Sequence, residues 1–373
     1  MRETIQLFRP AIGDEEIRAV EEVMRSGWLG LGPKTAEFER AFASAIGAFR
    51  VVGTISGTAA LDLAVRLLNL SPGDEILAPT ITFVSTAHVI VYNNCRPVFV
   101  DVDPVTLNIS VEDVKRKLSS RTRAIMVVHY GGRPAELDEL RAAVGHVPII
   151  EDCAHASGAY YKGKHVGTFG EMGCFSFHAV KNLTMGEGGA LAVHEKAHAD
   201  RALQLRWLGI DKGTWERTPD NKSYWWEYAV NEVGLKCHLN DILAAIGIVQ
   251  LKKLAALNAR RKQIVDRYRE AFADLDWLEM PAPDDADHRS SWHICCVRLR
   301  GRDRDALSEY LKAHAIMTGV HYKPIHLYRC YGYQLFLEVA EREFRRMISL
   351  PNHPGLSDDD VAHIIETIRR FPG

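Results

Sequence analysis

The chain has 373 residues, of which 47% are hydrophobic, 25% charged and 9% aromatic, as is typical of a folded globular protein. This length predicts two domains, or one large domain with an appendage. Lys and Arg number 46 against 48 Asp and Glu, so the formal net charge is only −2. That balance argues against a nucleic-acid partner and against a basic membrane-binding surface.

No uninterrupted apolar run approaches the ~18 residues that a membrane span needs, and the charged start of the chain does not resemble a signal peptide. The seven cysteines form no CxxC pair and no zinc-type spacing with histidine. We therefore expect a cytoplasmic protein with reduced cysteines, without a bound metal and without a membrane anchor.

Apolar residues at helical spacing predict helices over 14–24 and 34–46, separated by a glycine-rich loop. From residue 50 to about 195, short β-rich segments alternate with helical ones. The predicted strands are 51–54, 75–78, 97–100, 124–128, 148–151, 174–177 and 190–193. The predicted helices between them are 58–68, 84–92, 111–118 and 136–144. This alternation predicts a mostly parallel sheet with both faces covered.

The pattern changes after this region, because residues 210–236 are rich in Trp, Tyr and charge and are interpreted as an excursion from the core. The elements predicted beyond it are a long helix over about 240–272, a proline-rich linker at 281–283, a strand at 292–299, a helix at 303–313, a second strand, a loop and a terminal helix at 358–371. We expect a large domain over residues 1–250 and a smaller α+β domain over residues 251–373. The N-terminal segment is a candidate to pack on the smaller domain.

The motif Ser56-Gly57-Thr58 lies between a predicted strand and a predicted helix. Gly57 permits close approach of a ligand to the backbone, and Thr58 can donate from its hydroxyl and its amide. Free amides at a helix N-terminus bind anions such as phosphate. Ser and Thr at this place are also common helix caps, so the motif is consistent with both roles.

Asp152 lies at the end of a predicted apolar strand. In open parallel sheets, ligands bind beyond the carboxyl ends of the strands, where an acid can hold a cationic nitrogen. The alternative is that Asp152 caps the next segment, and the sequence alone leaves both roles open.

Lys181 follows an apolar strand and precedes a glycine turn that leads into another strand. A lone lysine is normally solvated, but in a partly dry pocket it loses its proton more easily and acts as an amine nucleophile. Ser176, earlier in the same segment, can supply a hydroxyl to a bound anion. Together with the aromatic loop residue Phe83, these motifs supply what pyridoxal 5'-phosphate requires: an amine, an acid for its pyridinium nitrogen, phosphate donors and a flat side chain over its ring.

The segments SGTAALDLAVRLL, IIEDCAHASGAYYKGKHVGTFG, CFSFHAVKNLTMGEGGAL and GLKCHLNDILAAIGIVQL are similar to the DegT/DnrJ/EryC1/StrS family of pyridoxal-phosphate-dependent sugar aminotransferases. The resemblance covers nearly the whole chain, and the pattern SFHxxKNxTxGEGG is highly specific. It implies an α/β fold of the aspartate-aminotransferase type (fold type I), in which a large domain with a mostly parallel mixed sheet is followed by a smaller α+β C-terminal domain.

The resemblance also implies roles for individual residues. Lys181 would form the Schiff base and move protons, and Asp152 would pair with the pyridinium nitrogen. The other residues expected to hold the cofactor are His155 beside the ring hydroxyl, Phe83 on the ring, and Gly57, Thr58 and Ser176 on the phosphate. Lys236 stands where many relatives have an Asn that reaches the partner subunit's phosphate site, which implies a homodimer with shared active sites.

The expected substrate contacts, also by resemblance, are Trp28, Leu29, Tyr322, Lys323 and His326, for which ordinary loop packing is the alternative. The implied reaction passes an amino group from L-glutamate, through pyridoxamine phosphate, to a nucleotide-linked keto-sugar, with a 4-keto-6-deoxy sugar favoured. A cyclitol ketone is an open alternative. Two other readings are a sugar dehydratase, whose relatives carry His in place of Lys181, and a non-catalytic regulator, against which Lys181, Asp152 and Ser176 argue.

Overall fold

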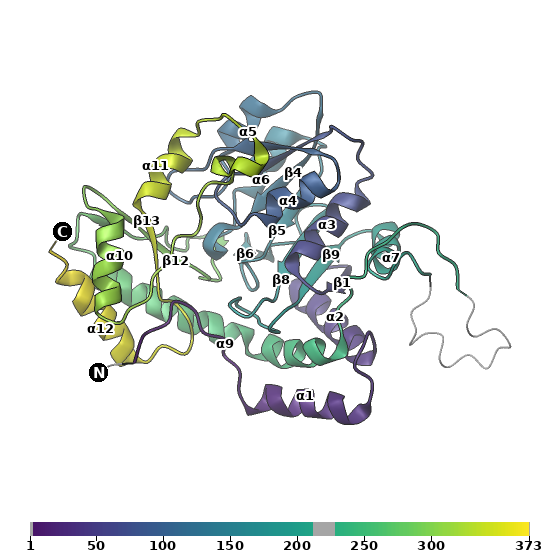
Figure 1. Ribbon diagram of the computed structural model, residues 1–373, viewed down its shortest axis with the longest axis horizontal. Coiled ribbons are helices and arrows are strands. Elements are labelled where there is room, and N and C mark those ends of the chain that lie inside the picture. The colour runs from purple at the N-terminus through teal and green to yellow at the C-terminus, as the bar shows by residue number, and fades with distance from the viewer. Residues whose placement is uncertain (1–2, 212–227, 373) are drawn as a thin grey trace.

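A computed structural model describes residues 3–211 and 228–372 of the chain. Figure 1 shows a large domain built around a central sheet and a small C-terminal domain beside it, where both ends of the chain lie. This arrangement confirms the α/β architecture that the alternating pattern predicts.

The large domain contains a seven-stranded sheet of order β1-β9-β8-β5-β4-β2-β3. Neighbouring strands from β8 to β3 are parallel, whereas β9 runs antiparallel to both β1 and β8. The strands are β1 (Arg50–Thr54), β2 (Glu75–Pro79), β3 (Arg96–Val100), β4 (Thr122–Val128), β5 (Ile149–Asp152), β8 (Met172–Ser176) and β9 (Gly189–Val193). Each predicted strand of this sheet is therefore present, with bounds that shift by at most two residues.

Helices cover both faces of the sheet because its strands are apolar on both sides. Successive side chains alternate, so that Leu77 packs into the core on one face and Ile76 into the core on the other. The helices of the large domain are α1 (Asp14–Ser26), α2 (Pro33–Ile46), α3 (Gly57–Leu67), α4 (Ser85–Tyr92), α5 (Val111–Lys117), α6 (Leu137–Val144) and α7 (Lys196–Leu205). The sequence did not predict α7.

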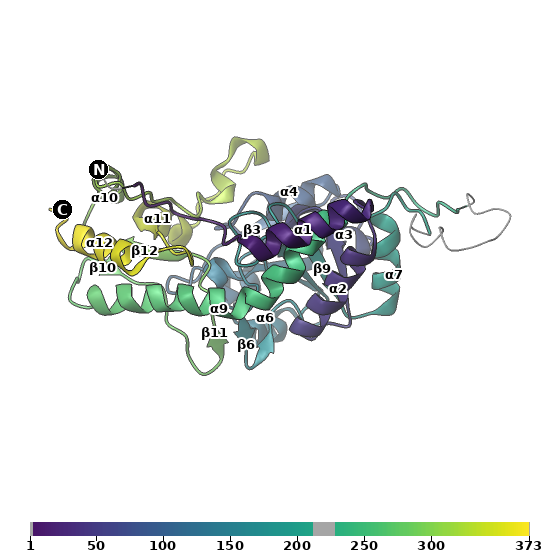
Figure 2. The ribbon, with the colours of Figure 1, turned by 90° about the horizontal axis from the view of Figure 1, so that it is seen from below.

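The long helix α9 (Asp241–Ala271) runs from beneath the large domain to the small one, as Figure 2 shows. Its first part packs against α1 and α2, and its second part contributes Ile264 and Tyr268 to the core of the small domain. The expected division after residue 250 falls inside this helix. By length and composition α9 is apolar enough to cross a membrane, although such a helix also occurs inside globular proteins, and Leu254 and Ile264 belong to the cores of the two domains.

The small domain holds a three-stranded antiparallel sheet of β10 (Leu278–Glu279), β12 (Cys295–Leu299) and β13 (Met347–Leu350). Its helices are α10 (Arg304–Ala313), α11 (Glu338–Arg346) and α12 (Asp358–Arg369), and short 3-10 turns span Ile325–Leu327 and Arg329–Tyr331. Ile5 belongs to its core and bridges Ile316, so the N-terminal segment packs on this domain. The sequence did not predict α11 or β10.

Two local features differ from the expectations. The strand predicted at 292–299 begins only at Cys295, because Trp292 has a φ of 54° that is incompatible with a strand. A third small sheet joins β11 (His288–Arg289) to the hairpin of β6 (Tyr160–Tyr161) and β7 (Lys164–His165). The excursion expected at 210–236 lies mostly outside the described residues.

Asp241 connects the start of α9 to the start of α2. Its carboxylate accepts hydrogen bonds from the amides of Lys34 (3.0 Å) and Thr35 (2.9 Å) and from the Thr35 hydroxyl (2.8 Å). We predict that Asp241→Ala lowers the free energy of unfolding by about 3 kcal/mol, because buried donors then lack an acceptor. The matched change Asp266→Ala removes only an exposed pair with Lys262 and is expected to cost less than about 0.5 kcal/mol. Equal losses in urea denaturation would contradict this role.

Candidate active site

Two adjacent carboxylates end strand β5, and the alternation of a strand sends them to opposite faces of the sheet. Glu151 accepts hydrogen bonds from the backbone amides of Gly167, Phe169 and Gly170, each at 2.7 Å, and from His129 Nε2 at 3.0 Å. These bonds keep the pKa of Glu151 low although burial acts to raise it. Glu151 therefore holds the loop between β7 and β8.

His129, Glu151 and Cys153 lie close enough together to resemble a metal site. However, both Glu151 oxygens already accept two hydrogen bonds, and His129 Nδ1 accepts one from the Ala135 amide. Burial also raises the pKa of the Cys153 thiol far above its usual range, so it stays protonated. These groups therefore form a hydrogen-bond network that supports the structure.

Asp152 points to the opposite face and keeps part of its hydrogen-bonding capacity free. The Thr86 hydroxyl donates to Oδ2 at 3.0 Å, and the Ala154 amide donates to Oδ1 at 3.1 Å. Burial raises the pKa of Asp152, while these two donors and the charge of Lys181 oppose the rise. A carboxylate with two donors can still accept a hydrogen bond from a ligand.

Lys181 lies in the connection between β8 and β9, near enough to Asp152 for the charge of that carboxylate to act on its pKa. Burial lowers the pKa of Lys181 from 10.5 to about 8, against the opposing effect of the Asp152 charge. Within the described part of the chain, no side chain or carbonyl accepts a hydrogen bond from this amine. Gly186 has a φ of 83°, which glycine adopts without strain, and it turns the chain back toward β9.

An anion cradle lies at the N-terminus of α3. Ser56 caps this helix by accepting a hydrogen bond from the Ala59 amide at 3.1 Å. Gly57 and Thr58 occupy the first helical positions, where backbone amides have no partner inside the helix. A Cβ added to Gly57 would lie 2.8 Å from Ser176 Cβ, so glycine is needed to bring this turn against β8. Ser56 therefore acts as the helix cap, and the amides of Gly57 and Thr58 remain available to bind an anion.

Aromatic and imidazole rings close the site from the side of the small domain. His155 Nε2 and the Tyr322 hydroxyl are 3.0 Å apart, and the Tyr322 ring lies 6.1 Å from that of Phe83. The His155 ring lies 4.7 Å from the ring of His293, which stacks on Phe8 at 5.6 Å. Burial and the charge of Lys181 lower the pKa of His155 and His293, so both are neutral.

The structure thus brings together seven of the residues expected to form the site: Gly57, Thr58, Phe83, Asp152, His155, Ser176 and Lys181, with Tyr322 beside them. Sequence reasoning missed Thr86, His293 and Phe8, which contact the site residues. His293 carried a weak signal, because it is a polar residue at the start of the apolar segment SWHICCVRL. Thr86 carried none, because threonine is ordinary in the first turn of a helix.

The other residues expected to contact the substrate or the partner's phosphate have different neighbours within the single chain. Trp28 donates a hydrogen bond from Nε1 to the Leu31 carbonyl within its own loop, and Leu29 is exposed. Lys236 lies over the Trp207 ring at 3.3 Å, and Lys323 lies 5.0 Å from the Tyr328 ring.

His326 is buried, and both of its ring nitrogens have partners. Its Nδ1 is 2.7 Å from the Thr80 hydroxyl, and its Nε2 is 3.2 Å from Glu341. Both ring nitrogens of His326 thus have partners within the chain, and its role as a substrate contact stays a prediction.

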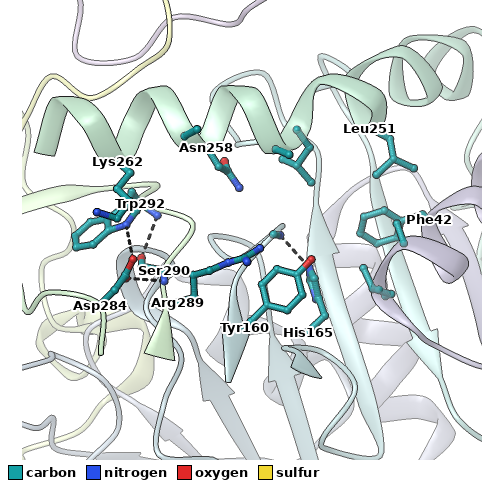
Figure 3. A pocket seen from close by; sticks show the side chains of 16 residues that line it. Phe42, Tyr160, His165, Leu251, Asn258, Lys262, Asp284, Arg289, Ser290 and Trp292 are labelled. Carbon is teal, nitrogen blue, oxygen red and sulfur yellow. Dashed lines mark hydrogen bonds between the residues drawn. The ribbon is translucent and has the colours of Figure 1, made fainter. Parts of the chain in front are cut away.

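Apart from this site, a hollow of about 410 Å³ lies between α2, α9 and residues 284–292 (Figure 3). Its polar residues are largely paired: Asp284 accepts hydrogen bonds from the Ser290 amide and from Trp292 Nε1, and Arg289 lies over the Tyr160 ring at 4.1 Å. Neither Lys181 nor Asp152 lines this hollow.

The two carboxylates of β5 should respond differently to neutralisation. We predict that Glu151→Gln lowers the free energy of unfolding by about 3 kcal/mol, because its amide group would face backbone donors. Asp152→Asn should cost about 1 kcal/mol or less, because only two donors are involved. Urea denaturation monitored by circular dichroism measures both, and a larger loss for Asp152→Asn would refute the assignment.

The low pKa of Lys181 predicts a distinctive pH dependence of its reactivity. In the cofactor-free protein, acylation of Lys181 should rise through a midpoint near pH 8, whereas a free lysine titrates near 10.4. Asp152→Asn should lower the midpoint, because the Asp152 charge favours the protonated amine. Peptide mass spectrometry across pH 6–11 measures it, and a midpoint above about 10 would contradict a desolvated amine.

Comparison with known proteins identifies the family to which this chain belongs. A family model described as the DegT/DnrJ/EryC1/StrS aminotransferase family matches residues 10–369. The spore coat polysaccharide biosynthesis protein SpsC of Bacillus subtilis is 38% identical, over 96% of this chain and 95% of its own length.

Solved structures are similar over almost their whole length. The aminotransferase TlmJ from Streptoalloteichus hindustanus is 39% identical, with a TM-score of 0.92 over 98% of each chain. Spr1654 from Streptococcus pneumoniae, solved in PLP and PMP forms, is 32% identical with a TM-score of 0.90, over 98% of this chain and 96–97% of its own. The chain therefore belongs to the DegT/DnrJ/EryC1/StrS aminotransferase family of fold type I, a family of pyridoxal-phosphate-dependent sugar aminotransferases.

Proposed function

We propose that this enzyme uses pyridoxal 5'-phosphate to transfer an amino group from L-glutamate to a nucleotide-linked keto-sugar, with a 4-keto-6-deoxy sugar favoured. The observation that carries the proposal is the Lys181 amine, whose pKa burial lowers to about 8, facing Asp152 beside an anion cradle. An amine that loses its proton near neutral pH is both a nucleophile and a proton carrier.

The residues present fit the cofactor. The amides of Gly57 and Thr58 and the hydroxyl of Ser176 suit a phosphate, and a Cβ at Gly57 would close this cradle. Asp152 has free acceptor capacity for a protonated ring nitrogen, and its burial makes that ion pair strong. When bound, the cofactor supplies an electron sink and carries the amine between the two substrates as its pyridoxamine form.

Individual residues of this chain would move the proton, hold the charge of the ring nitrogen and contact the ring. Lys181 would take the proton from the donor carbon as general base and deliver it, as general acid, to the cofactor carbon bonded to the same nitrogen. Asp152 holds positive charge on the ring nitrogen, and Thr86 fixes the orientation of this carboxylate through its 3.0 Å hydrogen bond. His155 is the proposed partner of the cofactor's ring hydroxyl. Phe83, 56% exposed in the single chain, is the proposed cover of the ring.

We propose a homodimer with shared active sites, in which Lys236 reaches the partner subunit's phosphate cradle. Its amine is partly desolvated over Trp207, and burial lowers its pKa. Val230 and Val233 in the same segment are 58% and 91% exposed, as expected of residues that a second copy covers. A cation near a phosphate forms a strong charge-assisted hydrogen bond.

On the sugar side, Tyr322 and Lys323 of the small domain remain the proposed contacts, with Trp28 and Leu29 as further candidates. The name of SpsC, a polysaccharide biosynthesis protein, supports a role in amino-sugar synthesis. The cysteines of the described residues are all free and mostly buried, which supports a reducing, cytoplasmic location. A dehydratase is disfavoured because Lys181 stands where those relatives carry His.

The proposal is tested with the purified protein reconstituted with pyridoxal phosphate. L-Glutamate should remove the visible absorbance band and yield 2-oxoglutarate, and one member of a panel of nucleotide-linked 3-keto and 4-keto sugars should restore it. Lys181→Ala should fold normally but lose turnover by at least about 10³-fold, since no other group moves the proton. The matched variant Lys262→Ala, on the exposed face of α9, should retain full turnover. Near-normal turnover of Lys181→Ala would refute the proposal.

A further inference from the structure

The hollow shown in Figure 3 is separated from the candidate active site by a single segment of chain. Ser290 and Trp292 line the hollow. Ser291, which lies between them in the sequence, instead donates its hydroxyl to the His155 carbonyl at 2.7 Å. Neighbouring residues of this segment therefore belong to two different spaces, and a ligand in the hollow would not touch the reacting groups of the site.

The hollow is large enough for a small organic molecule and has two unlike ends. Its volume of about 410 Å³ lies within the range of ligand pockets, roughly 300–1,000 Å³. In Figure 3, Phe42 and Leu251 lie at one end, whereas Lys262, Asp284 and Trp292 lie at the other. The side chains of α2 and α9 that supply the apolar lining are Phe42, Ala45, Ile46, Leu251, Leu254 and Ala255.

The acid at the polar end is already engaged. Asp284 accepts a hydrogen bond from the Ser290 amide at 2.8 Å and another from Trp292 Nε1 at 3.3 Å. It is the one acidic residue among those that line the hollow, where two cations, Arg289 and Lys262, are also present. Within the described part of the chain, neither cation forms an ion pair with Asp284, so the lining carries an excess of positive charge.

Arg289 is the cation with unused hydrogen-bonding capacity. Its guanidinium lies 4.1 Å over the Tyr160 ring, and no group of residues 3–211 and 228–372 accepts a hydrogen bond from it. A guanidinium stacked on an aromatic face keeps its N–H edge available for a carboxylate. Lys262 pairs with Asp266 at 2.7 Å and still adds positive charge. His165 is neutral, because burial lowers its pKa to about 4.

We propose that this hollow is a second binding site, which takes a small organic carboxylate with an apolar body. The carboxylate binds the N–H edge of Arg289 through two parallel hydrogen bonds, and the charge of Lys262 adds to the attraction. The Tyr160 hydroxyl, which has no hydrogen-bond partner among the described residues, can donate to the same group. The apolar body lies against Leu251 and Leu254, which removes apolar surface from water. This inference does not depend on the proposed aminotransferase function.

The test uses the cofactor-loaded protein and 2-naphthoate, a carboxylate on a flat apolar ring system, with binding measured by calorimetry. Ala255→Trp places a large side chain in the hollow from an exposed position of α9 and should abolish saturable binding of 2-naphthoate. The matched control is Ala256→Trp, at the next exposed position, which does not line the hollow. This control should bind 2-naphthoate like the wild type. Thermal unfolding establishes that each variant is folded.

A second variant tests the recognition of charge and keeps the proposal falsifiable if Ala255→Trp does not fold. Arg289→Gln should weaken 2-naphthoate binding about tenfold, because a pair of charge-assisted hydrogen bonds is lost. It should leave the affinity for 2-naphthamide, an uncharged analogue of the same shape, nearly unchanged. The control Arg123→Gln removes an exposed arginine that does not line the hollow and should alter neither affinity.

The contrary outcomes are equally specific. Saturable binding that persists in folded Ala255→Trp would place 2-naphthoate elsewhere, such as in the cofactor site, and would overturn the inference. Absence of saturable binding to the wild type would do the same, as would an equal loss in Ala256→Trp. A parallel loss of 2-naphthoate and 2-naphthamide binding in Arg289→Gln would show that the carboxylate is not recognised.

Discussion

Removal of Lys181 and Asp152 from water is the constraint on which the rest of the structure depends. An exposed lysine would be protonated and inert near neutral pH, whereas burial lowers the pKa of Lys181 to about 8. The negative charge of Asp152 opposes this shift, so the two groups must be close enough to interact and dry enough for the amine still to lose its proton. The fold satisfies both demands by ending β5 and beginning the β8–β9 connection at the same edge of the sheet.

Residues far apart in the sequence keep this edge dry. Phe8 of the N-terminal segment stacks on His293, which in turn contacts His155 and the site. The helix α9 joins the cores of both domains, and Asn258 on it holds the residue after Lys181. The small domain is thus part of the reaction centre, because it supplies the wall that excludes water.

The sequence predicted the central sheet well because its strands are buried on both faces, which leaves short apolar segments that are easy to recognise. It also singled out Lys181, Asp152 and Gly57 as candidate site residues, each of which ends or follows a strand of this sheet. It could not predict the two-residue strands β6, β7, β10 and β11, which are too short to show a period. The sequence-based prediction also missed α7 and α11, although both segments consist largely of good helix formers.

Long-range contacts explain why the sequence did not point to every residue near the site. Thr86 and His293 are ordinary in their local sequence and become important only because the fold brings them to Asp152 and His155. His326 lies in a motif shared with the family, but Thr80 and Glu341 take up its ring nitrogens. Local sequence patterns therefore pointed to the candidate reactive groups. The hydrogen-bond and packing partners of each group could be found only in the folded structure.

The most direct test of the account is to reduce the cofactor-loaded protein with borohydride and to map the modified peptide by mass spectrometry. The account predicts a stable pyridoxyl group on the Nζ of Lys181 and on no other lysine. An unmodified Lys181, or modification of a different lysine at full occupancy, would contradict it.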